Sequence, residues 1–273
     1  MRRSSESILL RLKYVISIGL CYSGLNSIIR KFLKHLYGNL PVVTVLCYHS
    51  ITDEQLPNFE SQLNYLLKKD FKFISGKELL EIMSQPNKFS NHCRYVCLTF
   101  DDCYENNYSV VRPILLKRRI PAIFFAVSAK LGQIADWNDG ECNGGQLMTK
   151  KQLKEMALTF DIGAHSQNHV KLGNVKSEIV LNEIENSKKE LTELTEHKVL
   201  FFAYPSGSYN SMVFELLSKF ELEAAFTINQ HSNYSYEEKY ELGRYLVNPE
   251  YFRDFKLKVM GGYDWFYFFG KFF

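Results

Sequence analysis

The sequence predicts an α/β fold in which one parallel sheet is surrounded by helices. Short apolar runs rich in Val, Ile and Phe alternate with longer segments of helical periodicity, which is the pattern of βαβ units. The 273 residues fit one barrel-sized domain, and a hydrophobic content of 46% supplies a large core. The sequence shows no internal repeat and no low-complexity tract that would divide it.

The expected elements follow in chain order. Strands are predicted at residues 42–50, 94–100, 160–164, 199–202 and 223–227. The spacing of apolar residues predicts helices at 57–69, 106–119, 149–158 and 175–196. Thr149 suits the N-cap of the third of these helices. Polar, turn-rich stretches at 136–145 and 229–240 predict long loops over the mouth of a barrel, where substrate specificity often resides.

Two adjacent carboxylates, Asp101 and Asp102, follow the strand at 94–100. The backbone turns where a strand ends, so both acids can reach one cleft. Like charges this close raise one another's pKa, which suits one acid to metal binding and the other to accepting a proton. An isolated Asp-Asp pair is more often a helix cap on the surface, so this interpretation depends on its context.

His165 and His169 supply that context, because they follow the predicted strand at 160–164. Their spacing places both imidazoles on one side of a helical turn or of a compact loop. One Asp with two His is a suitable ligand set for zinc or a similar first-row metal, with positions left for water. Alone, the histidine pair would be ordinary surface residues, but with the two aspartates it predicts a metal site.

Two further strand ends carry groups of interest. The apolar run at 201–204 leads into Pro205 and Gly207, which predicts a sharp turn with exposed backbone amides that could stabilise an oxyanion. The strand at 42–50 ends on His49. Taken singly, His49 is a structural residue, but it occupies the same relative place as the acidic and histidine pairs.

Four motifs in this order resemble the polysaccharide deacetylases of carbohydrate esterase family 4. They are Y-H-S at 48–50, T-F-D-D at 99–102, H-S-x-x-H at 165–169 and F-A-Y-P-x-G at 202–207. More narrowly, the chain is similar to the branch of poly-N-acetylglucosamine deacetylases over residues 42–247, and the segment 121–125 fits as well. The resemblance implies a distorted (β/α) barrel and a hydrolase that removes acetyl groups from N-acetylated sugars.

By motif, the resemblance also implies the role of each residue. Asp101 is the expected general base, and His49 takes the place of the general acid. Asp102, His165 and His169 are the expected ligands of one divalent cation, with zinc favoured and cobalt, nickel or iron as alternatives. The acetyl pocket and its oxyanion amide are expected at Pro205, Ser206, Gly207 and Tyr209.

The sequence departs from the family pattern at several positions. Ala203 stands where most members have an Arg that pairs with the catalytic Asp, and Arg244 is either a compensating cation or an ordinary structural arginine. Cys103 replaces the usual Gly after the aspartates, where it could narrow or stiffen the loop. Asp264 belongs to a late Asp-Trp pair that we expect to be structural. Trp137, in the loop at 136–145, either stacks on a sugar ring or anchors the loop.

Residues 1–40 are expected to form a basic, amphipathic helical extension to a catalytic domain at 41–255. They hold seven Lys and Arg against one Glu. A helix lying on the cytoplasmic face of the membrane is favoured, and packing against the barrel is the alternative. The aromatic tail at 256–273 either enters the same interface or covers the bottom of the barrel.

The favoured function is metal-dependent removal of N-acetyl groups from N-acetylhexosamine units of a surface polysaccharide or its lipid-linked precursor. The alternatives are hydrolysis of another acyl group or of a non-sugar amide, and carbohydrate binding by a degenerate catalytic site. A net charge of +3 is too small to indicate a nucleic-acid partner. Cysteines inside core-like runs favour a reducing, cytoplasmic location, and an exported form stays open.

Overall fold

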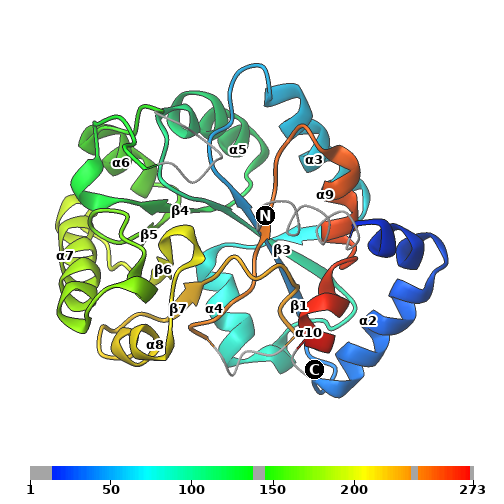
Figure 1. Cartoon of the computed structure of the whole chain (residues 1–273). Helices are drawn as coiled ribbons and strands as arrows, with labels where there is room; N and C mark the ends of the chain where they lie inside the picture. Colours follow the sequence, from blue (N-terminus) through cyan, green and yellow to red (C-terminus); the bar gives the residue numbers. More distant parts are fainter. Residues whose placement is uncertain (1–13, 138–144, 235–238, 271–273) are drawn as a thin grey trace, which may run out of the picture.

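The structure is a computed structural model that describes residues 14–137, 145–234 and 239–270. In these residues, eight parallel strands form one curled sheet with helices around its outside (Figure 1), which confirms the distorted (β/α) barrel. The strand order is β7-β6-β5-β4-β3-β1-β8, and β2 pairs with β3 off this path. The strands are β1 (Val42–Tyr48), β2 (Phe71–Phe73), β3 (Arg94–Phe100), β4 (Ile123–Ala126), β5 (Asp161–Ala164), β6 (Phe201–Ala203), β7 (Ala224–Phe226) and β8 (Tyr245–Leu246).

The helices are α2 (Leu25–Leu36), α3 (Leu56–Lys68), α4 (Gly76–Ser84), α5 (Arg112–Arg118), α6 (Lys150–Ala157), α7 (Ser177–Thr195), α8 (Ser211–Leu217), α9 (Phe252–Val259) and α10 (Asp264–Gly270). Helices α3 to α8 lie between strands in the chain, whereas α2 precedes β1 and α9 and α10 follow β8. The expected N-cap at Thr149 is confirmed, with a capping box to Gln152. The helix expected at 106–119 begins instead as a π-helical segment, Asn107–Val111, before α5.

Side chains alternate between the two faces of a strand, and this alternation determines which of them point into the barrel interior. Tyr95 and Cys97 of β3 pack in the interior cluster, whereas Val96 and Leu98 pack outward against the helices. Because side chains alternate along a strand, Asp101 lies on the inward side, two positions after Thr99. The interior is closed at the amino-terminal end by α4, whose Leu79 and Ile82 join the interior cluster.

One segment links the two edges of the sheet. Leu242 pairs with Phe226 of β7, and three residues later β8 begins to pair with residues 46–47 of β1. Arg244 lies between these two contacts. Because this segment closes the barrel, Arg244 lies on the inner side of the sheet, near the end of β3, which the aspartates follow.

The amino-terminal extension and the tail are attached to each other and to the barrel. Leu33 of α2 packs against Tyr234 and Phe268. Asp264 is fully buried and accepts hydrogen bonds from the Ser232 amide (2.8 Å) and from the Tyr234 hydroxyl (2.6 Å). The Arg30 Nε of α2 lies 3.8 Å from the same carboxylate. Asp264 is thus the structural residue that the sequence indicated.

Some boundaries and loops differ from expectation. Residue 256 lies within α9, so this helix crosses the boundary expected between domain and tail. The stretch at 229–240 was expected at the mouth, which is wrong for Asn233, because it is buried and pairs with Val43 at the opposite end of the barrel. Residues 1–13, 138–144, 235–238 and 271–273, on which parts of the expected extension, loops and tail fall, lie outside the described residues.

Within the described ranges, none of the helices combines the length and the apolar character that crossing a bilayer requires.

Candidate active site

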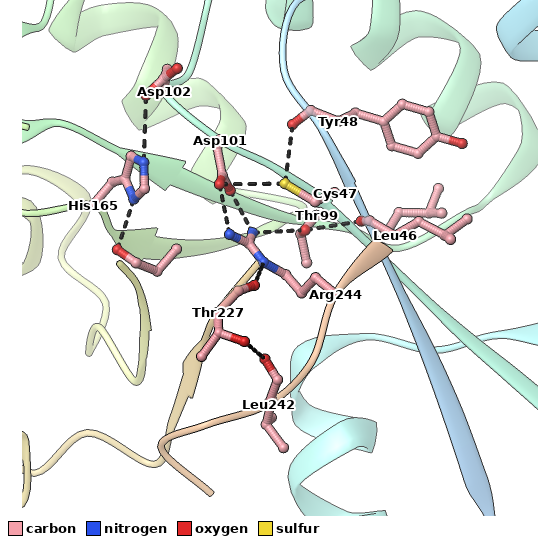
Figure 2. Close-up of polar contacts among 12 residues, drawn as sticks. Leu46, Cys47, Tyr48, Thr99, Asp101, Asp102, His165, Thr227, Leu242 and Arg244 are labelled. Atoms are coloured by element: carbon pink, nitrogen blue, oxygen red, sulfur yellow. Dashed lines mark hydrogen bonds and ion pairs between the residues drawn. The ribbon is translucent and has the colours of Figure 1, made fainter. Parts of the chain in front are cut away.

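Asp101 and Arg244 form a buried, bidentate ion pair inside the barrel. The Arg244 Nη1 and Nη2 donate to the two carboxylate oxygens over 2.6 and 2.7 Å (Figure 2). Both side chains are almost completely shielded from solvent. Burial raises the pKa of Asp101, but the charge and hydrogen bonds of Arg244, together with the nearby His165 and His49, outweigh this effect and hold that pKa well below its usual range. Asp101 is therefore ionised and fixed in orientation.

The guanidinium of Arg244 makes further hydrogen bonds and also contacts two aromatic rings. Its Nε donates to the Thr227 carbonyl (3.0 Å), and Nη1 also donates to the Thr99 hydroxyl (3.1 Å). The guanidinium lies over the rings of Phe125 and Phe226, with centroid distances of 5.5 and 5.9 Å. The sequence left two interpretations of Arg244 open, a compensating cation or an ordinary structural arginine. Its ion pair with Asp101 supports the compensating cation.

Asp102 points away from this pair, toward two histidines. Its Oδ1 lies 3.6 Å from the His165 Nε2 and 3.5 Å from the His169 Nε2. One donor atom from each of the three residues lies within 4.8 Å of the others, and all three residues are buried. Burial, with a smaller contribution from His165, lowers the pKa of His169 to about 2, so its imidazole is neutral and can offer a lone pair.

The loop between the two histidines is held by hydrogen bonds. The His165 Nδ1 is 2.8 Å from the Ala203 carbonyl oxygen, which leaves Nε2 directed at Asp102. Glu183 of α7, which is buried, accepts from both the backbone amide and the side chain of Asn168, each over 2.8 Å. The segment is a compact loop, one of the two conformations that the sequence allowed, and His169 takes a positive φ of 59°.

Residues after β3 also adopt left-handed backbone conformations. Asp102 has a φ of 69° and Cys103 a φ of 56°. Such angles are strained for residues with a Cβ, and strain of this kind is concentrated at functional sites. A glycine at position 103 would adopt this angle freely, whereas Cys103 adopts it while fully buried beside Asp102.

His49 and Cys47 lie on the other side of Asp101. Donor atoms of these three residues fall within 4.8 Å of one another, and the Cys47 Sγ donates to the Asp101 Oδ2 over 3.4 Å. His49 is partly exposed, in contrast to the other two. Sequence reasoning placed His49 here but missed Cys47, although its position two residues earlier on β1 gives both side chains the same inward direction.

The turn after β6 is tight. The Gly207 and Ser208 amides donate to the carbonyls of Tyr204 (2.9 Å) and Pro205 (3.0 Å). Ser206 has a φ of 52°, and a Cβ on Gly207 would lie 2.3 Å from Ile228. The amides of Gly207 and Ser208 are therefore occupied by hydrogen bonds within the turn. The amide of Ser206 is then the candidate donor to an oxyanion.

The Tyr209 side chain contacts Tyr204, Asn229 and Glu241. Its ring stacks on Tyr204 at a centroid distance of 4.8 Å. Its hydroxyl accepts from the Asn229 amide group over 3.0 Å and donates to Glu241. The structure thus places Tyr209 in a polar cluster beside the turn.

Trp137 stacks on a predicted metal ligand. Its ring lies 4.2 Å from that of His169, with an angle of 22° between the planes. One face of the indole is therefore covered by protein, as in a loop anchor. We expect Trp137→Ala to weaken metal binding by about tenfold, as loss of groups that orient ligands does, and Trp137→Phe to weaken it less. Metal titration monitored by calorimetry checks this, and a rise in KM with unchanged metal affinity would instead indicate contact with the sugar.

The fold and this site define a class: a (β/α)-barrel protein whose charged and metal-ligating side chains gather at the carboxyl ends of the strands, where enzymes of this architecture have their active sites. The family model of polysaccharide deacetylases matches residues 88–225, half of the chain. This chain belongs to the polysaccharide deacetylase family.

Individual proteins agree with this assignment. The poly-beta-1,6-N-acetyl-D-glucosamine N-deacetylase of Staphylococcus aureus is 28% identical over 214 residues, which are 75% of this chain and 70% of that protein. Among solved structures, IcaB from Ammonifex degensii matches with a TM-score of 0.71 at 23% identity, over 81% of this chain and 98% of its own. The Streptococcus pyogenes deacetylase PplD, solved with acetate, matches with a TM-score of 0.68 at 23% identity, over 81% and 99%. These two structures share the fold.

Proposed function

We propose that the chain is a metal-dependent N-deacetylase in which Asp102, His165 and His169 hold one divalent cation. The observation that carries this proposal is the separation of their donor atoms. At 3.5 and 3.6 Å, the two Asp–His distances are longer than an ordinary hydrogen bond. They are close to the roughly 3.4 Å between neighbouring donors around a tetrahedral zinc with bonds of about 2.1 Å. The donor set, one carboxylate and two neutral imidazoles, suits zinc or a similar metal.

When bound by these residues, the cation would supply Lewis-acid chemistry that makes water more acidic and polarises a carbonyl group. The protein groups around it have complementary roles. Asp101, kept ionised by Arg244, accepts the proton that water loses as its oxygen bonds to the acetyl carbon. The Ser206 amide donates to the carbonyl oxygen as negative charge develops there. His49 donates a proton to the nitrogen as the C–N bond breaks, which yields acetate and a free amino sugar.

The substrate we propose is an N-acetylhexosamine unit of a polysaccharide or of its lipid-linked precursor. The activity named for the Staphylococcus aureus relative supports an N-acetylglucosamine polymer. Acetate and formate release should be measured side by side from β-1,6-linked N-acetylglucosamine oligomers, polyprenyl-linked N-acetylhexosamine and their N-formyl analogues. Acetate release from either sugar substrate is the expected result. Activity restricted to N-formyl groups or to small non-sugar amides would move the chain to another amidohydrolase function.

The metal site makes a prediction of its own. His165→Ala removes one ligand while leaving the Asp101–Arg244 pair in place, so we expect bound metal to fall from one ion per chain to a small fraction and acetate release to be lost. Elemental analysis after dialysis measures the first effect, and the activity assay measures the second. His197→Ala is the matched control, because this histidine lies outside the cluster and should leave both quantities unchanged. Equal metal content in the parent and His165→Ala would contradict the assignment.

A further inference from the structure

A second cavity lies at the end of the barrel opposite the candidate active site. Its volume is about 540 Å³, within the usual range for ligand sites. Residues of α2 and α9 line it, together with the first residues of three strands, Val42 of β1, Phe71 of β2 and Arg94 of β3. Figure 1 shows where these elements lie in the fold. We call it the basal cavity. Because the aspartates follow the carboxyl end of β3, the two sites are separated by the length of that strand, about 20 Å for seven residues.

The basal cavity is strongly basic. Its lining residues in the described part of the chain include no Asp or Glu, and its cations are Arg30, Lys31, Lys34, Arg94, Arg253 and Lys256. Arg30 lies 3.8 Å from Asp264, whereas the described residues provide no carboxylate ion pair for the other five. Burial and the nearby Arg30 lower the pKa of Lys34, as expected where positive charge is incompletely compensated. Charge complementarity therefore favours an anionic ligand.

The same cavity has an apolar side. Val42, Phe71, Leu257 and Met260 line it together with the cations. A small hydrophilic anion would make no use of these side chains, so the lining fits an anionic group attached to a hydrocarbon chain.

The helix at the edge of the cavity also exposes an apolar stripe. Leu25, Ile28, Phe32 and Leu36 of α2 are spaced by three and four residues and are 44–64% exposed. Lys31 and His35 are exposed on the same helix. An exposed apolar stripe with basic neighbours is the pattern of a helix that lies in the interface of a membrane.

We propose that the basal cavity binds the phosphate headgroup of an anionic membrane lipid while the apolar stripe of α2 enters the same leaflet. The phosphate meets Lys31, Arg94 and Arg253, which come from three different elements and are all exposed. A soluble phosphate ester would satisfy these cations but would leave the stripe in water. Since the active site is at the other end of β3, a chain held in this way keeps its catalytic mouth free.

The test is co-sedimentation of the full chain with vesicles of phosphatidylcholine alone or with 30% phosphatidylglycerol. We expect binding that requires the anionic lipid and that falls on the order of 100-fold in the triple variant Lys31→Gln, Arg94→Gln, Arg253→Gln, at about fivefold for each charge. The control is Lys150→Gln, Lys151→Gln, Lys189→Gln, which removes three exposed cations elsewhere and should bind as the parent does. Acetate release from a soluble oligomer should be the same in all three proteins, which shows that they are folded.

Three results would overturn the proposal. The first is equal binding to neutral and anionic vesicles, and the second is equal losses in the two triple variants. The third is absence of vesicle binding combined with protection of the parent against heat by inorganic phosphate, which would assign the cavity to a soluble phosphate compound. Loss of vesicle binding by Phe32→Ser at unchanged charge would support insertion of the stripe.

Discussion

Replacing Asp101 by asparagine is expected to lower kcat for acetate release by about 10²–10⁴-fold, the usual contribution of a general base. Asparagine has nearly the same shape and can still accept from Arg244, but it cannot take a proton from water. The three expected metal ligands are untouched, so metal content should stay at one ion per chain. Steady-state kinetics and elemental analysis of the same preparation measure both quantities.

The neighbouring carboxylate provides a matched control for this experiment. Asp102→Asn makes the same chemical change one residue later, at a side chain that faces His165 and His169. It should reduce metal content and activity together, whereas Asp101→Asn should reduce activity alone. If Asp101→Asn turns over as fast as the parent, Asp101 has no part in the reaction.

Removing the partner of Asp101 should have a large effect on stability as well as on rate. Arg244→Ala leaves a carboxylate buried without its cation, and breaking a buried pair in this way costs about 3–5 kcal/mol. We expect Tm to fall by roughly 10 °C, because one kcal/mol corresponds to a few degrees in a domain of this size. Differential scanning calorimetry measures the loss, and the acetate assay below the lowered Tm measures the accompanying drop in activity.

Arg244→Lys separates charge from geometry. Lysine keeps a positive charge but cannot form the two parallel hydrogen bonds that the guanidinium makes. Its stability should therefore lie between that of the parent and that of Arg244→Ala. A Tm for Arg244→Ala within one or two degrees of the parent would show that the pair does not stabilise the fold.

Much of the site was predictable because each functional group follows a strand. Strongly apolar runs with turn residues after them place Asp101, His165 and the turn at Pro205 at the carboxyl edge of a parallel sheet, and such edges meet in space. The positions of these residues required only that the strands be parallel and belong to one sheet, in which β4 lies between β3 and β5. The helices with clear apolar spacing, such as α3 and α7, were predictable for a similar reason.

The remaining features depend on contacts between residues far apart in sequence. β2 and β8 have three and two residues, too few for a periodic pattern. Arg244 reaches Asp101 across 143 positions because β8 pairs with β1 as the barrel closes. No local pattern distinguishes such an arginine from one on the surface. Asn233 was misplaced for the same reason, since its burial depends on the backbone groups of Val43 and Gly243.

In the proposed function, acetate release depends on a cation that three side chains hold. The most direct measurement is acetate release from an N-acetylglucosamine oligomer by the chelated protein during stepwise addition of zinc, with bound metal determined in the same samples. We predict that activity is absent from the chelated protein and rises in proportion to bound metal until one ion per chain is reached. Full activity without metal, or no acetate release at one bound ion per chain, would rule out a metal-dependent deacetylase.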